Sequence, residues 1–156
     1  MKALLLFLMI VVALSAQAQK GKDLPAVNSE IVAYVKVHEG QKIGRGECWD
    51  LAAEALNSVK ADWDGFYGFG KEVQPDDVLP GDIAQFEGVQ VEVRTENAIH
   101  RESYGHHTAI VMEVHAPRVF TIAHQNAGPG GRTVNETDLA LANVKSGTIR
   151  FYRPQR

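Results

Sequence analysis

The feature that most constrains the fold is a change in apolar spacing near Pro75, close to the middle of the 156-residue chain. Before Pro75, apolar residues recur at helical spacing in two stretches, near 29–37 and 47–59. After it, apolar and polar residues alternate in short runs bounded by glycine and proline, which is typical of antiparallel strands. The sequence therefore predicts an α+β domain in which two or three N-terminal helices cover a sheet of about five or six strands.

The individual elements follow from this division. A cap at Asn28 or Ser29 is expected to begin the first helix, and the aromatic, glycine-rich segment 61–70 is expected to be a loop. The sequence predicts a turn at 79–82, strands at 83–86, 89–93, 107–115, 118–125 and 147–152, loops at 95–105 and 126–132, and a short helical turn at 137–144. The strand 89–93 is interpreted as the hairpin partner of 83–86.

Residues 1–18 are predicted to be an export signal. Lys2 precedes an almost wholly apolar run, and a small-residue Ala-Gln-Ala cleavage pattern ends at Ala18. The run is too short to prefer a transmembrane span, so no stable membrane association is expected after cleavage. Residues 19–28 then form an exposed lead-in to a single domain over 29–156, which we expect to be a monomer in the periplasm or outside the cell.

The only cysteine, Cys48, lies where a loop containing Gly44 and Gly46 turns into the second helix. Free backbone N–H groups and the helix dipole favour a thiolate at such a position, which is how many reactive cysteines are placed. The alternative is a small buried apolar residue. An exported domain with one cysteine has no internal disulfide to form, and this favours the catalytic interpretation.

A cysteine nucleophile needs a base within hydrogen-bond reach. His106 and His107 begin a predicted strand, where adjacent side chains point to opposite faces, so only one of them can face Cys48. Alternation places His106 on the slightly more apolar face, so that spacing alone does not select His107.

The base also needs a partner that orients it. If the strands 107–115 and 118–125 pair through a tight turn at 116–117, residue 107 lies opposite residue 125 or thereabouts. This pairing brings His124 or Asn126 close to the histidine pair, and either side chain can accept its proton.

Four segments together resemble the CHAP family of cysteine, histidine-dependent amidohydrolases/peptidases, within the papain-like superfamily that also holds the NlpC-type cell-wall peptidases. They are Gly-Glu-Cys-Trp-Asp-Leu-Ala at 46–52, Leu-Pro-Gly-Asp-Ile-Ala-Gln-Phe at 79–86, Gly-His-His-Thr-Ala-Ile-Val at 105–111 and Ile-Ala-His-Gln-Asn at 122–126. The resemblance extends over about 29–153 and, with the short signal, implies a bacterial exported protein.

The resemblance implies that Cys48 is the nucleophile and His107 the general base. The third position of the family, often acidic, falls on His124, and its asparagine falls on Asn126. NlpC-type relatives have a histidine at the third position, and we prefer His124 as the orienting residue, with Asn126 as the alternative. The flanking residues Gly46, Trp49 and His106 are candidates for substrate binding. The backbone N–H of Cys48 and the side chain of Gln41 are candidate oxyanion donors.

The implied activity is hydrolysis of amide bonds in peptidoglycan, or in another peptide substrate, through a thioacyl-enzyme and without a cofactor. Such an enzyme could equally be a secreted amidase toxin or a protease. A net charge of −3 disfavours a nucleic-acid partner. A metal site is disfavoured because the histidines show no regular zinc-binding spacing. The remaining alternative is a non-enzymatic module that binds a peptide or glycan on the same scaffold.

Overall fold

The computed structural model describes residues 23–156, so the predicted signal over 1–18 lies outside the described residues. Within this range the elements are α1 (Ala26–Val37), α2 (Cys48–Ser58), β1 (Lys71–Val73), η1 (Pro75–Asp77), β2 (Ile83–Arg94), β3 (Ile99–Ala116), β4 (Val119–His124), β5 (Asn135–Ala140), η2 (Leu141–Asn143) and β6 (Val144–Arg153). The strands form one antiparallel sheet in the order β1-β6-β2-β3-β4-β5. The α+β prediction holds, with the sheet as the larger part.

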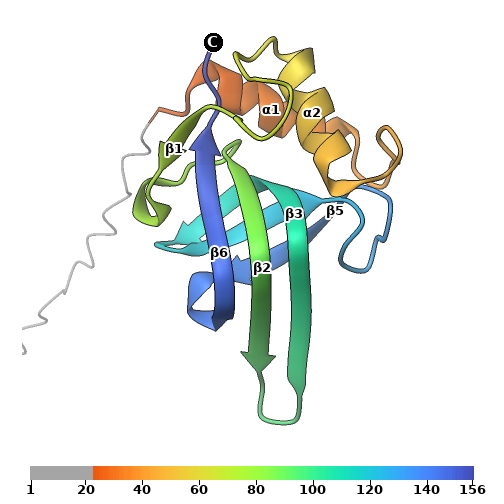
Figure 1. Ribbon diagram of the computed structural model, residues 1–156, viewed down its shortest axis with the longest axis vertical. Helices are drawn as coiled ribbons and strands as arrows, with labels where there is room; N and C mark the ends of the chain where they lie inside the picture. The colour runs from red at the N-terminus through yellow and green to blue at the C-terminus, as the bar shows by residue number, and fades with distance from the viewer. Residues whose placement is uncertain (1–22) are drawn as a thin grey trace, which may run out of the picture.

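The helices lie together above one end of the sheet (Figure 1), and α2 contacts β3. α2 has the predicted extent, but α1 is preceded by Pro25, three or four residues before the expected cap at Asn28 or Ser29. Asn28 does not cap it, because this side chain is fully buried and donates to Asp82 Oδ1 at 2.8 Å. No helix among residues 23–156 is long and apolar enough to cross a bilayer.

The predicted turn at 79–82 connects α1 to the sheet. The fully buried carboxylate of Asp82 accepts hydrogen bonds from Asn28, from the backbone N–H of Leu79 and from the guanidinium of Arg153 at the end of β6. Gly81 has a φ of +83°, and a Cβ there would lie 2.5 Å from the Asn28 carbonyl oxygen. These packing and hydrogen-bond contacts account for the Pro-Gly-Asp sequence without a catalytic role.

The prediction of a hairpin between 83–86 and 89–93 was wrong, because both runs belong to the continuous strand β2. The partner of β2 is β3, and the turn between them covers only 95–98, so most of the predicted loop 95–105 is strand. This hairpin projects beyond the rest of the sheet (Figure 1), and its β3 half over 99–105 is mostly polar and exposed. That half therefore shows no alternation of apolar and polar residues that would predict a strand.

The tight turn predicted at 116–117 is present and joins β3 to β4, with Ile110 opposite Ala123. The helical turn predicted at 137–144 was mostly wrong, because β5 extends to Ala140 and only Leu141–Asn143 is helical. The last predicted strand is part of β6, which lies between β1 and β2.

Both faces of the central sheet are buried. One face packs against the helices and contributes Ile83, Ile110 and Met112 to that core, while the other encloses a second core containing Phe86 and Val111. Adjacent residues of β2 and β3 are therefore both apolar near the middle of the sheet. For this reason strand alternation could not distinguish His106 from His107.

Candidate active site

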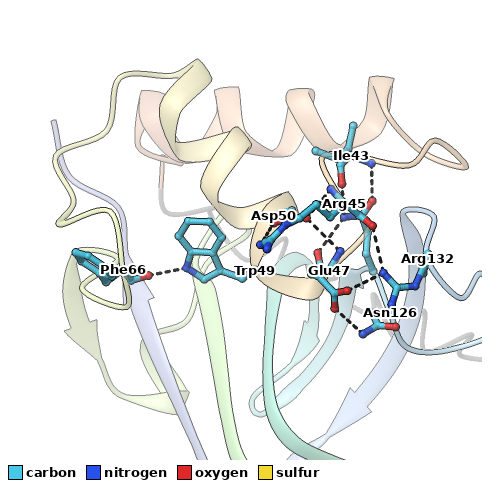
Figure 2. A network of polar contacts seen from close by, with 9 residues as sticks. Ile43, Arg45, Glu47, Trp49, Asp50, Phe66, Asn126 and Arg132 are labelled. Atoms are coloured by element: carbon cyan, nitrogen blue, oxygen red, sulfur yellow. Dashed lines mark hydrogen bonds and ion pairs between the residues drawn. The ribbon is translucent and has the colours of Figure 1, made fainter.

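Cys48 is the first residue of α2, as predicted, and its side chain is half-buried. The residues around it fix the start of the helix. The Asp50 carboxylate accepts from the backbone N–H of Arg45 at 2.7 Å and of Glu47 at 3.3 Å, and it binds the Arg45 guanidinium at 2.9 Å (Figure 2). This capping arrangement satisfies the free N–H groups at the turn into the helix and so positions the thiol.

The cysteine loop is joined to the segment that follows β4. The Glu47 carboxylate binds Arg132 Nη1 at 2.6 Å and Asn126 Nδ2 at 2.8 Å (Figure 2). The fully buried amide of Gln125 accepts from the Ile43 N–H at 2.7 Å and donates to the carbonyl oxygens of Ile43 and Glu47, each at 3.1 Å. These contacts hold the end of β4 against the start of α2, although the two are far apart in the sequence.

His107 and His124 form a buried pair. His107 Nε2 lies 3.1 Å from His124 Nδ1, and His124 Nε2 lies 3.3 Å from the Thr137 hydroxyl. The two histidines that the resemblance implies as general base and orienting residue are therefore in contact, through Nε2 of His107. If both Nε2 atoms carry the proton and donate, His107 Nδ1 is an acceptor.

These residues surround a groove of about 560 Å³. Its lining residues are Glu47, Cys48, Glu102, Ser103, Tyr104, Gly105, His106, His107, Asn126, Ala127 and Gly128. The groove brings together Cys48, His107 and two further predicted residues, His106 and Asn126. His106 is exposed at the groove and binds Glu87 Oε2 at 2.9 Å.

Besides His124, three candidate residues lie outside this lining. Trp49 donates from Nε1 to the Phe66 carbonyl oxygen at 2.7 Å (Figure 2). Gly46 is required for space, because a Cβ there would lie 2.9 Å from the Arg132 carbonyl oxygen. Gln41 donates to the Val37 carbonyl oxygen and does not line the groove. The contacts of Trp49 and Gly46 are structural, and Gln41 is not placed as an oxyanion donor.

The pKa shifts favour uncharged groups in the resting site. Burial raises the pKa of the Cys48 thiol, although backbone N–H groups of Thr108, Trp49 and Cys48 itself act in the opposite direction. Burial, with smaller effects from His124 and His106, lowers the pKa of His107 to about 3. Burial also lowers the pKa of His124 to about 4. The thiolate expected at the helix start is therefore disfavoured, and no hydrogen bond joins Cys48 to His107 among the described side chains.

Sequence reasoning missed Gln125, Arg132, Tyr104 and Glu102. Gln125 lies between the two candidate orienting residues, directly after β4, where its polar neighbours gave no signal that its amide is buried. Glu102 and Tyr104 fell in the predicted loop 95–105, where no spacing could place them on the groove. Within residues 23–156, no group of three or more His, Cys, Asp or Glu side chains is arranged to hold a metal ion.

Comparisons with known proteins agree with this fold. Residues 25–156 match the model of the AIM3/BBC1 cysteine proteinase-fold domain. One relative is the Altered inheritance of mitochondria protein 3 of Debaryomyces hansenii, 27% identical over 135 residues. The match covers 74% of this chain and 14% of that protein, so the chain spans about one seventh of the relative's length.

Solved structures show the same fold at low sequence identity. The crystal structure of Ly7917 aligns with a TM-score of 0.51 at 16% identity, covering 80% of this chain and 62% of that one. The crystal structure of Ly7917 with the hydrolyzing product of MDP aligns with a TM-score of 0.52 at 16% identity, covering 81% and 62%.

The comparisons support a papain-like cysteine proteinase fold, but they do not single out the CHAP family suggested by the motifs. The relative is a yeast protein, which gives no support to the expected bacterial source. Because the family model matches 25–156, the chain belongs to the AIM3/BBC1 cysteine proteinase-fold domain family.

Proposed function

We propose that the protein is an exported cysteine peptidase or amidohydrolase in which Cys48 is the nucleophile and His107 the general base. The observation that carries this proposal is that both residues line one groove, while His124 Nδ1 lies 3.1 Å from His107 Nε2. This gives a nucleophile, a base and an orienting group in the order that acyl transfer requires.

The pKa directions specify how the reaction begins. Cys48 and His107 are both neutral at rest, so the proton moves from Sγ to His107 Nδ1 as the sulfur attacks the amide carbonyl carbon. The carbonyl oxygen gains negative charge, which the backbone N–H of Cys48 at the start of α2 can stabilise. His107 then gives the proton to the leaving nitrogen as the C–N bond breaks. Water attacks the resulting thioester, which releases the acid and restores the thiol.

The proposed substrates are amide bonds of peptidoglycan, either within the peptide stem or between sugar and peptide. Support comes from the CHAP-like motifs and from the predicted export signal. The fold likeness to Ly7917, which was solved with the hydrolyzing product of MDP, is consistent with this class. A peptide from another source is the remaining substrate class.

The direct test is digestion of purified peptidoglycan sacculi, followed by measurement of newly released amino and carboxyl groups. The wild-type protein should release them, and Cys48→Ala should not. The matched control is His115→Ala. It removes an exposed histidine of β3, the strand that also contains His107, at a position outside the groove. Equal release by wild type and Cys48→Ala, or none by either, would contradict the proposal.

A non-enzymatic binding module is a second candidate, because the resting thiol is protonated and has no hydrogen bond to His107 in the described part of the chain. In that case the wild type and Cys48→Ala would cosediment equally with intact sacculi, and neither would release new groups.

A further inference from the structure

The groove carries an uneven charge. Its carboxylates come from Glu47 and Glu102, and no lysine or arginine of residues 23–156 lines it. The buried His107 is neutral near pH 7, because burial lowers its pKa to about 3. The carboxylates that a ligand meets in the groove are therefore these two glutamates, while the third titratable group of the lining near its surface, His106, is bonded to Glu87 Oε2 at 2.9 Å.

The two carboxylates are not equivalent. Glu47 is neutralised by Arg132 at 2.6 Å and receives a second hydrogen bond from Asn126 at 2.8 Å. Glu102 accepts only from the hydroxyl of Tyr104 among the described residues, and a phenol does not cancel its charge. Glu102 is also exposed. It is therefore the uncompensated anion of the groove.

Tyr104 holds this anion in place. Its ring is buried and lies 5.1 Å from the Phe86 ring and 4.9 Å from the His107 ring, measured between centroids. Burial, and then the bond to Glu102, raise the pKa of Tyr104, so the hydroxyl keeps its proton and donates. The carboxylate is thus oriented before any ligand arrives, and one of its oxygens has no partner within residues 23–156.

We infer that Glu102 is a specificity residue that binds a primary ammonium group of the substrate, such as a free α-amine or a diamino-acid side chain, beside the bond that is cut. This rests on the proposed function and narrows it to cationic peptide substrates. An ammonium group can donate to the free carboxylate oxygen, whereas an acetylated amine cannot supply the charge and a ligand carboxylate is repelled.

The test measures binding without turnover. Full-length Cys48→Ala protein is titrated with alanyl-alanine amide, its N-acetyl derivative and its N-succinyl derivative, which carry a positive, zero and negative charge, and binding is followed by NMR. Glu102→Gln is made in the same background, since glutamine can still accept from Tyr104. The matched control is Glu96→Gln, which removes one negative charge from the exposed hairpin turn outside the groove.

We expect the ammonium peptide to bind about threefold more tightly than the acetyl peptide, as for a solvent-accessible ion pair, and the succinyl peptide to bind most weakly. Glu102→Gln should abolish these differences in affinity among the three peptides, and 1 M NaCl should reduce them. Glu96→Gln should leave them unchanged. No binding of the ammonium peptide, or an order unchanged by Glu102→Gln, would overturn the inference. Failure of peptidoglycan hydrolysis by the wild type would overturn the proposed function and leave this binding result intact.

Discussion

His107 Nε2 lies 3.1 Å from His124 Nδ1, whereas the amide of Asn126 turns away and donates to Glu47 at 2.8 Å. The two residues that the sequence left as alternative orienting groups therefore make different contacts. His124 holds the imidazole of His107, and Asn126 holds the loop that carries the cysteine.

This difference predicts unequal effects on turnover. His124→Leu should lower kcat by about 100-fold, because the His107 ring loses the partner that fixes its tautomer. Asn126→Gly should lower it by less than about tenfold, since glycine accepts the local φ of 57° and Arg132 still binds Glu47. The measurement is steady-state hydrolysis at pH 7, and equal losses in the two variants would contradict the assignment.

Thr137 is expected to act through His124. The hydroxyl lies 3.3 Å from His124 Nε2 and accepts a hydrogen bond from the N–H at that position. With its proton on Nε2, His124 has Nδ1 free to accept from His107. Thr137→Val should lower kcat about fivefold, the effect of one ordinary hydrogen bond, with KM little changed. Thr137→Ser should restore the rate. A valine variant as active as wild type would show that the tautomer is fixed without this contact.

The pH dependence of thiol alkylation separates a neutral pair from an ion pair. Because burial raises the Cys48 pKa and lowers that of His107, the iodoacetamide rate should rise in one step, with its midpoint above the ordinary thiol value of about 8.5. His107→Ala should keep that single alkaline step. A reactive plateau below pH 7 that disappears in His107→Ala would instead show a resting thiolate–imidazolium pair.

The pH dependence of the free energy of unfolding should also reflect the two buried histidines, His107 and His124. In the unfolded chain both bind protons near pH 6.5, while in the folded protein their pKa values are about 3 and 4, so acidification favours unfolding. Each histidine should lower the free energy of unfolding by about 2 kcal/mol as the pH falls from 7 to 5. In urea unfolding, His124→Leu should reduce this loss by about 2 kcal/mol, and an unchanged loss would show that His124 is accessible to protons in the folded state.

The sequence predicted those parts of the fold that have one buried face and a local signal. Helix α2, the start at Cys48 and the turn before β4 are examples, because helical spacing and the Ala-Pro turn are readable in short windows. The β3 half of the projecting hairpin was not predicted, because residues 99–105 are mostly polar and exposed and show no alternation. The choice of His107 came from family resemblance alone, because both faces of β3 are buried beside it.

The site residues show the same limit. Cys48 and the histidine strand are recognisable as residue types, but contacts such as those of Gln125 with Ile43 join positions more than 80 residues apart, which no local pattern encodes. The raised thiol pKa could not be predicted either, since it depends on burial of the sulfur against β3 and outweighs the backbone N–H groups at the helix start.

The position of β6 has a consequence for the order of folding. β6 inserts between β1 and β2. On its other side, β2 pairs with β3, the strand that contains His107. Until residues 144–153 are available, β1 has no neighbour and β2 has an open edge, so these non-local pairings form late. The strand that contains His107 therefore belongs to a sheet whose centre is completed only when β6 pairs with both β1 and β2.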